Sequence, residues 1–522
     1  MPNLCRVLAN SGLACGVALG IFLLARANAV AAPEPSDAAI VHVLDRLGYG
    51  PRPHDVARVR AMGLRPWIEQ QLHPDRIPDR DVQRRLAGLR SLDMSARQLA
   101  LTYPYPGQVK RLKDMARRGN RFAQRFVSEL PPRARRGRPQ DILMELSAAR
   151  LLRDLYSNHQ LKQVMVDFWD NHFNVYFYKG ADRLELSSFE RNVIRPHAMG
   201  RFRDLLGAVA RSPAMLYYLD NWRSTARRKG GVNENYGREL MELHTLGVNG
   251  GYTQRDVVEV ARCFTGWTVD RPDFGGGFVF RPGMHDDGPK TVLGHHIPAG
   301  GGESDGDAVL DILARDPHTA DHLSFELCRR FVADAPPPSL VRRVAAVYME
   351  TDGNIRAMLR TIFLSPEFNA PANDGAKVKT PLEFTMSAMR AVNAQTLDAR
   401  PVLWVLQRMG MSPYLCLPPT GYPDQAVDWL STDGMLERMS FATALMGGRV
   451  RGTVVQPVRL LSAFSLDPDT MVSQMSAALL GVRVEATTRA VLREAVVRVE
   501  EGRATFPQII ALLLGSPEFQ RR

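Results

Sequence analysis

Apolar side chains recur every three or four residues along most of this chain, which is the period of an α-helix with one buried face. Near the amino end, Ile40, Val43, Leu44 and Leu47 share one such face, and Gly48 ends the segment. The same period predicts helices over residues 143–155, 161–169, 235–246, 255–264, 341–349, 355–363 and 382–392. We therefore predict a mainly α, multi-helix globular fold.

One stretch departs from this helical pattern. Two short β-prone runs, at 278–280 and 291–293, flank segments rich in Pro, Gly and Asp. This predicts a small β-hairpin insertion near 275–297, with His285 and Asp286 in its loop.

The chain divides into three predicted parts. Residues 1–31 have a basic start, a short apolar run and small residues at the end, which is typical of a signal peptide, with a retained anchor as the alternative. Residues 36–395 form a predicted main helical domain. After an irregular Pro- and Gly-rich stretch, residues 396–522 form a predicted C-terminal helical segment packed on it. The signal peptide leads us to expect an exported protein, periplasmic or secreted. No later run is long and apolar enough for a transmembrane helix.

A short motif occurs twice. Leu364–Phe368 and Gly515–Phe519 both contain Ser-Pro-Glu-Phe after an apolar helix, where Ser-Pro-Glu can cap the next turn. An internal duplication and a coincidence both remain open on four shared residues.

Composition is ordinary for a globular protein, at 45% hydrophobic and 23% charged residues, and excludes a disordered or fibrous chain. The net charge of +12 is less ordinary, and its excess is local. Between residues 107 and 140 there are eleven Lys and Arg residues, and the only acidic residues there are Asp114 and Glu129. We expect a basic, insertion-like segment there that could meet an anionic envelope surface through residues 107–138, or be solvated without a partner. No nucleic-acid partner is expected of an exported protein.

The densest polar run is Asn233 to Gly247. On a helix, Glu239 and Glu242 share one stripe, whereas His244 lies on the opposite side. The two carboxylates could form half of a metal site or an acid/base pair. The alternative is that Glu234 pairs with Arg238 and that the remaining Glu residues cap neighbouring loops.

Two further clusters combine His with carboxylates. Asp170 and His172 end an apolar helix among aromatic residues, and the hairpin loop supplies His285 and Asp286. We predict a divalent metal bound by Glu239, Glu242, His285 and Asp286. Asp170 and His172 are then a further ligand or the general base, and His244 is a supporting group. A G-x-S-x-G match at 302–306 lacks the apolar strand that a serine hydrolase requires before it, so its Ser304 or Asp305 is better explained as a helix cap.

Several of these runs resemble a known family. They are HVLDRLGYGP from His42, DFWDNHFNV from Asp167, NENYGRELMELHTLGVNGGYTQRDV from Asn233, MHDDGPKTVLG from Met284 and PPTGYPD from Pro418. On them the chain is similar to the bacterial family called domain of unknown function 1800, from about residue 40 to the C-terminus. In that family the position of Asp170 is commonly His.

The resemblance implies an exported, mostly helical bacterial protein whose activity is unassigned, often encoded beside a second exported protein. Our first hypothesis is a metal-dependent, hydrolase-like enzyme of the envelope or exterior. The alternative is a non-catalytic scaffold or chaperone-like partner of a co-exported bacterial protein.

Overall fold

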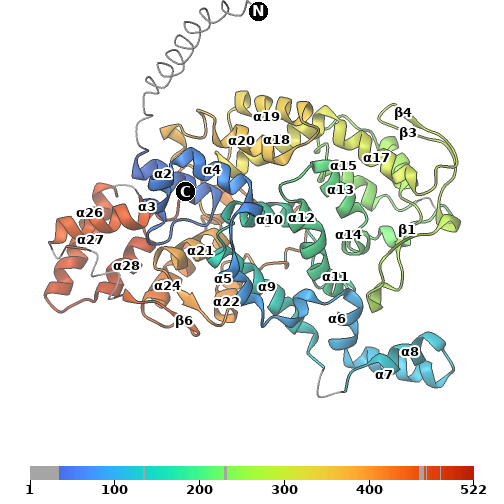
Figure 1. Cartoon of the computed structure of the whole chain (residues 1–522), viewed down its shortest axis with the longest axis horizontal. Coiled ribbons are helices and arrows are strands. Elements are labelled where there is room, and N and C mark those ends of the chain that lie inside the picture. Colours follow the sequence, from blue (N-terminus) through green and yellow to red (C-terminus); the bar gives the residue numbers. More distant parts are fainter. Residues whose placement is uncertain (1–34, 133–135, 228–231, 458–463, 466, 482–483) are drawn as a thin grey trace, which may run out of the picture. The chain divides into compact units, whose positions relative to one another are not determined.

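The computed structural model describes residues 35–132, 136–227, 232–457, 464–465, 467–481 and 484–522. Helices make up most of it (Figure 1), which confirms the predicted mainly α fold. The predicted signal peptide at 1–31 lies outside the described residues and stays a prediction. Among the described residues, no helix has the length and apolar character needed to cross a membrane.

The first third of the chain is a series of short helices. Its Pro and Gly residues interrupt the apolar pattern every ten residues or so, and this keeps each helix short. These helices are α2 (Asp37–Leu47), α3 (Asp55–Met62), α4 (Leu64–Leu72), α5 (Arg80–Leu86), α6 (Ala96–Thr102), α7 (Pro106–Arg117) and α8 (Arg121–Glu129). The basic segment predicted from the charge pattern forms α7 and α8, which pack against each other (Figure 1).

The next part of the chain, residues 139–263, contains the longest of the described helices, α9, with 18 residues. Helices α9 and α10 cover the predicted segments 143–155 and 161–169. The elements are α9 (Pro139–Tyr156), α10 (Gln160–His172), α11 (Asp182–Ser188), the π-helix η4 (Phe189–Ile194), α12 (Arg195–His197), α13 (Phe202–Ala210), α14 (Pro213–Tyr218), α15 (Asn235–Glu242) and α16 (Gln254–Cys263). The helix predicted over 235–246 is shorter than expected, since α15 ends at Glu242.

The predicted β insertion exists, but its strands pair differently. Strand β2 (Phe278–Phe280) pairs with β1 (Trp267–Val269), and β3 (Lys290–Val292) pairs with β4 (His295–Ile297), both antiparallel. The prediction paired the second and third of these segments with each other. It missed β1 because this strand has only three residues, too few to give a periodic signal. A third antiparallel pair joins β5 (Gln395–Thr396) to β6 (Thr453–Val454).

The remainder is again helical, and the predicted segment 355–363 coincides with one helix. The helices are α17 (Ser304–Arg315), α18 (Pro317–Phe331), α19 (Pro338–Glu350), α20 (Ile355–Phe363), α21 (Pro381–Ala391), α22 (Arg400–Arg408), α23 (Ala426–Trp429), α24 (Thr432–Met446), α26 (Pro468–Leu480), α27 (Ala486–Glu500) and α28 (Phe506–Leu514). The three cysteines Cys263, Cys328 and Cys416 are free and buried.

A three-helix unit occurs twice in this part. Helices α18, α19 and α20 pack in sequence, as do α26, α27 and α28 (Figure 1). Asp316 caps α18 and Asp467 caps α26, each directly before a Pro. The units end in the turns 365–368 and 516–519, whose serine hydroxyls accept hydrogen bonds from the phenylalanine amides at 3.0 and 3.3 Å. The separation between cap and turn is the same in both copies, which supports the internal duplication.

Contacts join residues 37–522 into one compact unit. Buried charge pairs link distant parts of it: the Glu383 carboxylate on α21 binds both Arg330 on α18, at 2.6 Å, and Arg522, at 2.9 Å. The predicted boundary between residues 395 and 396 stays a prediction.

Candidate functional site

A polar cleft of about 190 Å³ lies between the end of α10, the last turns of α18 and the loop that precedes α23. Ionisable side chains line it on two sides. Its lining includes Asp167, Phe168, Asn171, His172, Glu326, Arg329, Arg330, Thr380, Met411, Thr420, Tyr422, Pro423 and Asp424.

The cleft brings together two of the runs that carried the family resemblance. The Asn171 amide donates to the Tyr422 carbonyl oxygen at 2.8 Å, and its oxygen accepts from the Tyr422 amide at 2.7 Å. Gly421 has a φ of 70°, and a Cβ there would lie 2.5 Å from the Asn171 carbonyl oxygen. Only glycine allows this close approach, so the loop 418–424 is held against α10.

An imidazole–carboxylate pair forms one wall. His172 Nδ1 lies 2.8 Å from Glu326 Oε2, and Nε2 lies 3.3 Å from the His244 carbonyl oxygen. Because both ring nitrogens face oxygen acceptors, this arrangement is best satisfied by the doubly protonated imidazolium. The His172 side chain is 3% exposed, whereas that of Glu326 is 30% exposed and is the accessible member of the pair.

The Glu326 carboxyl is held in its charged form. Burial alone raises its pKa, but the charge of His172 and its contact with the carboxylate outweigh burial, so the pKa lies below its usual value. Aromatic rings fix the imidazole: Phe168 stacks on it at 6.1 Å, and Trp169 and Phe173 meet it edge-on.

The other wall contains two arginines, and only one of them forms ion pairs with residues that the structure describes. Arg330 binds the carboxylates of Asp167, at 3.2 Å, and Glu383, at 2.6 Å. Arg329 has no ion-pair partner within the part of the chain that the structure describes, and its buried Nε has no hydrogen-bond partner there. Its guanidinium lies only over the ring of Phe325, 4.4 Å from the centroid. Arg329 is therefore a cation of the cleft without a direct ion pair among the described residues, and its charge acts on Glu326 and Asp334 only through space.

Asp170 lies on the far side of α10 from this pair. It lines a smaller cavity of about 40 Å³ with Arg150 and Tyr414, and its carboxylate is 3.5 Å from the Arg150 guanidinium. Burial and then the charge of Glu190 raise its pKa well above the usual value. Asp170 and His172 therefore do not face one common ligand.

His244 supports His172 from behind. The helix ends before it, and its amide donates to the Glu239 carbonyl oxygen at 3.1 Å. The His244 and His172 rings are 6.1 Å apart, and burial, then the charge of His172, lower the His244 pKa well below its usual value. His244 is thus held in its neutral form beside His172.

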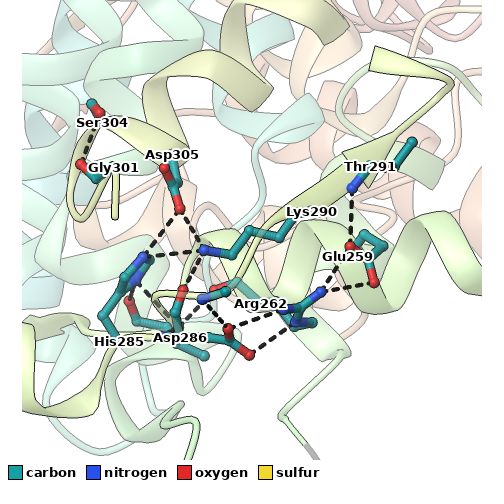
Figure 2. A network of polar contacts seen from close by, with 11 residues as sticks. Glu259, Arg262, His285, Asp286, Lys290, Thr291, Gly301, Ser304 and Asp305 are labelled. Carbon is teal, nitrogen blue, oxygen red and sulfur yellow. Dashed lines mark hydrogen bonds and ion pairs between the residues drawn. The ribbon is translucent and has the colours of Figure 1, made fainter. Parts of the chain in front are cut away.

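The hairpin residues belong to another network, shown in Figure 2. His285 Nε2 lies 3.2 Å from Asp305 Oδ2, and Lys290 donates to the same oxygen at 2.5 Å. Asp286 accepts from the Arg262 guanidinium at 2.9 and 3.0 Å, and this contact lowers its pKa. Both predicted ligands are thus held by partners that the spacing of the sequence did not indicate.

The predicted metal set is therefore not assembled. Glu239 and Glu242 lie on α15, while His285 and Asp286 are committed to Asp305 and Arg262. Within the described ranges, no three His, Cys, Asp or Glu side chains lie together as a metal site. The metal site expected from the sequence stays a prediction, without an assembled donor set among the described residues.

Sequence reasoning missed Glu326 and Arg329. A signal was present, because His322 and Glu326 are four residues apart on an apolar-striped helix, and His322 Nε2 lies 3.8 Å from Glu326 Oε1. Such pairs are common on exposed helices, so the spacing alone did not distinguish a site.

Comparison with known proteins agrees with the resemblance. A family model described as "Protein of unknown function (DUF1800)" matches residues 42–521. This chain belongs to the DUF1800 family. No curated protein and no solved structure matches it. The chemistry of this DUF1800 chain is therefore argued from the residues of its cleft.

Proposed function

We propose that this DUF1800 protein is an enzyme of the hydrolase type whose active centre is the cleft between α10 and α18. One observation carries the proposal: the His172–Glu326 pair faces the same cleft as Arg329, which has no direct ion pair among the described residues. A ligand with an anionic group would place that group at Arg329, and the His172–Glu326 pair would exchange a proton with it.

The duplicated unit supports this proposal. Counting from the equivalent caps, Glu326 on α18 corresponds to Ala477 on α26, and Arg329 corresponds to Leu480. The second copy forms the same three helices with apolar residues at these places. The charged residues of α18 are therefore not required by the three-helix unit, although desolvating them costs free energy.

The chemistry follows from the charges. An imidazolium beside a carboxylate is a proton donor for a leaving group, and a guanidinium stabilises negative charge that develops on the substrate. Together they are suited to hydrolysis of an ester-like bond in a substrate with a carboxylate or phosphate group: water attacks the ester centre and gives its proton to the Glu326 carboxylate, while the leaving oxygen takes a proton from His172. No step here depends on a metal ion.

The test is hydrolysis of p-nitrophenyl phosphate, whose anionic group fits the proposed site, by the purified protein, with the neutral ester p-nitrophenyl acetate for comparison. We expect Glu326→Gln to lower turnover by about 10² to 10⁴-fold, the usual contribution of acid–base catalysis. Asp321→Asn, an exposed carboxylate change on the same helix, is the control and should have no effect. Turnover that is equal in wild type and Glu326→Gln would contradict the proposal.

Export is part of the proposal, because residues 1–31 resemble a signal peptide. Deletion of 1–31 should retain the protein in the cytoplasm of a bacterial host, where the full chain should reach the periplasm or medium. The scaffold alternative, with a co-exported partner, requires that the cleft variants leave partner binding unchanged.

A second proposal concerns the α7–α8 pair, which we infer meets anionic lipid. Its basic side chains are exposed on one pair of helices: Lys110, Arg111, Lys113, Arg117, Arg118, Arg121 and Arg125. Only two of these have ion-pair partners on the same helix, Asp114 and Glu129. Phe122 and Phe126 anchor the pair by packing on Phe274.

Sedimentation with phosphatidylglycerol vesicles tests this surface. Binding should fall when Lys113 and Arg118 are both changed to Glu, and should weaken as salt rises. Binding only to an anionic polysaccharide, or equal binding to phosphatidylcholine vesicles, would contradict the lipid assignment.

A further inference from the structure

A second pocket, of about 530 Å³, lies on the other side of the loop that bounds the cleft. Leu417 and Pro419 of this loop line it, whereas Thr420 and Tyr422 line the cleft. The remaining wall residues are Tyr176, Lys179, Tyr218, Leu219, Asn235 and Glu239. The pocket therefore has aromatic and aliphatic walls with a few polar groups.

Most of these polar groups already have partners. Lys179 binds the Tyr218 carbonyl oxygen and, at 3.0 Å, the Asp220 carboxylate. The Tyr218 hydroxyl donates to the Leu417 carbonyl oxygen at 2.8 Å, and the Asn235 amide donates to Leu219 at 3.1 Å. These contacts build the wall and leave little capacity for a ligand.

Glu239 is different. Its carboxylate has neither a hydrogen-bond nor an ion-pair partner among the residues that the structure describes. The neighbouring Arg238 is engaged by Glu234, at 3.0 Å. Half-burial, and then the charge of Glu242, raise the Glu239 pKa more than the charge of Arg238 lowers it, so the negative charge is only partly compensated. A bound cation would supply the missing compensation.

We propose that this pocket binds an organic ammonium group. Glu239 would pair with the cation, while Tyr176, Leu417 and Pro419 would cover its alkyl groups. A desolvated ammonium beside aromatic and apolar walls gains both charge pairing and cation–π contact. This site is independent of the cleft, because the two share no lining residue.

Calorimetric titration with choline tests the proposal. We expect saturable binding by the full chain, and no saturable binding of 3,3-dimethylbutan-1-ol, which has the same shape without the charge. Glu239→Gln should weaken choline binding by about tenfold or more, since it removes the charge-assisted contact and keeps the side-chain shape.

The control is Asp321→Asn, an exposed carboxylate change on α18 outside the pocket lining, which should bind choline as wild type does. Tyr176→Leu should weaken binding less than Glu239→Gln. Absence of choline binding, equal binding of the neutral alcohol, or wild-type affinity in Glu239→Gln would each overturn the proposal. Preferential binding of glucose would instead show a site for neutral hydroxyl groups and would also overturn it.

Discussion

The network of Asp305, Lys290 and His285 gives the sharpest prediction about stability. The Lys290 and His285 side chains are 0% exposed and that of Asp305 is 2% exposed. Asp305 lies in the first turn of α17, and Lys290 begins β3. The carboxylate therefore attaches the hairpin to the helix by a pair that water does not screen.

Asp305→Asn removes the negative charge and leaves the Lys290 ammonium buried beside the imidazole of His285. Lys290 keeps the Asp286 carbonyl oxygen, the neutral amide and the more distant His285 Nε2, at 3.5 Å, as its contacts. Loss of one partner from a buried charge pair costs about 3 to 5 kcal/mol. This is a large part of the roughly 5 to 15 kcal/mol by which a domain is usually stable.

Urea unfolding followed by tryptophan fluorescence measures this loss. Trp267 is a local reporter, because its ring lies against Gly306 of α17. The matched control is Asp311→Asn on the same helix, whose carboxylate is 48% exposed and binds Arg203 at 2.6 Å. Exposed pairs contribute about 0 to 1 kcal/mol, so the control should unfold almost as wild type does. Equal midpoints for Asp305→Asn and Asp311→Asn would refute the reasoning.

Three other predictions concern charged groups in the core. Burial, and then the charge of Arg46, lower the His42 pKa from 6.5 to about 4. The free energy of unfolding should therefore fall by about 3 kcal/mol as the pH decreases through this range. His42→Gln should make urea midpoints less pH-dependent there, and an unchanged slope would contradict this. Because the Glu239 pKa is raised, Glu239→Gln should stabilise the protein at neutral pH. This gain in unfolding free energy should vanish below a pH of about 4. A variant less stable than wild type at neutral pH would contradict the prediction. Arg522→Met should lower the unfolding free energy by about 1 to 3 kcal/mol. This is less than the loss of a whole ion pair, because Arg330 still binds Glu383. The exposed change Arg521→Met should cost little, and equal thermal midpoints for the two variants would contradict the prediction.

The helices were predictable because burial of one face imposes a regular period on the sequence. The segment 355–363 coincides with α20, where Asn354 caps the start. The helix over 235–246 was predicted too long, because the apolar period continues past Glu242 while the backbone leaves the helix there. Strand pairing was also mistaken, since three-residue strands carry almost no register information.

The site was only partly predictable. His172 was correctly placed at the end of an apolar helix, but its partner Glu326 comes from a helix more than a hundred residues away, and local spacing contains no information on that contact. His285 and Asp286 have the residue types of metal ligands, yet the fold pairs them with Asp305 and Arg262. Tertiary pairing therefore decides which of several polar clusters remains open to a ligand.

The central claim is that Arg329 holds an anionic group in the cleft beside His172 and Glu326. Calorimetric titration of the purified protein with acetate and with inorganic phosphate tests it most directly, with Arg329→Leu as the variant and Arg342→Leu, an exposed change on α19, as the control. We expect saturable binding of at least one anion by wild type and Arg342→Leu, and binding about tenfold or more weaker in Arg329→Leu. Equal affinities in all three proteins, or no binding of either anion by wild type, would contradict the claim.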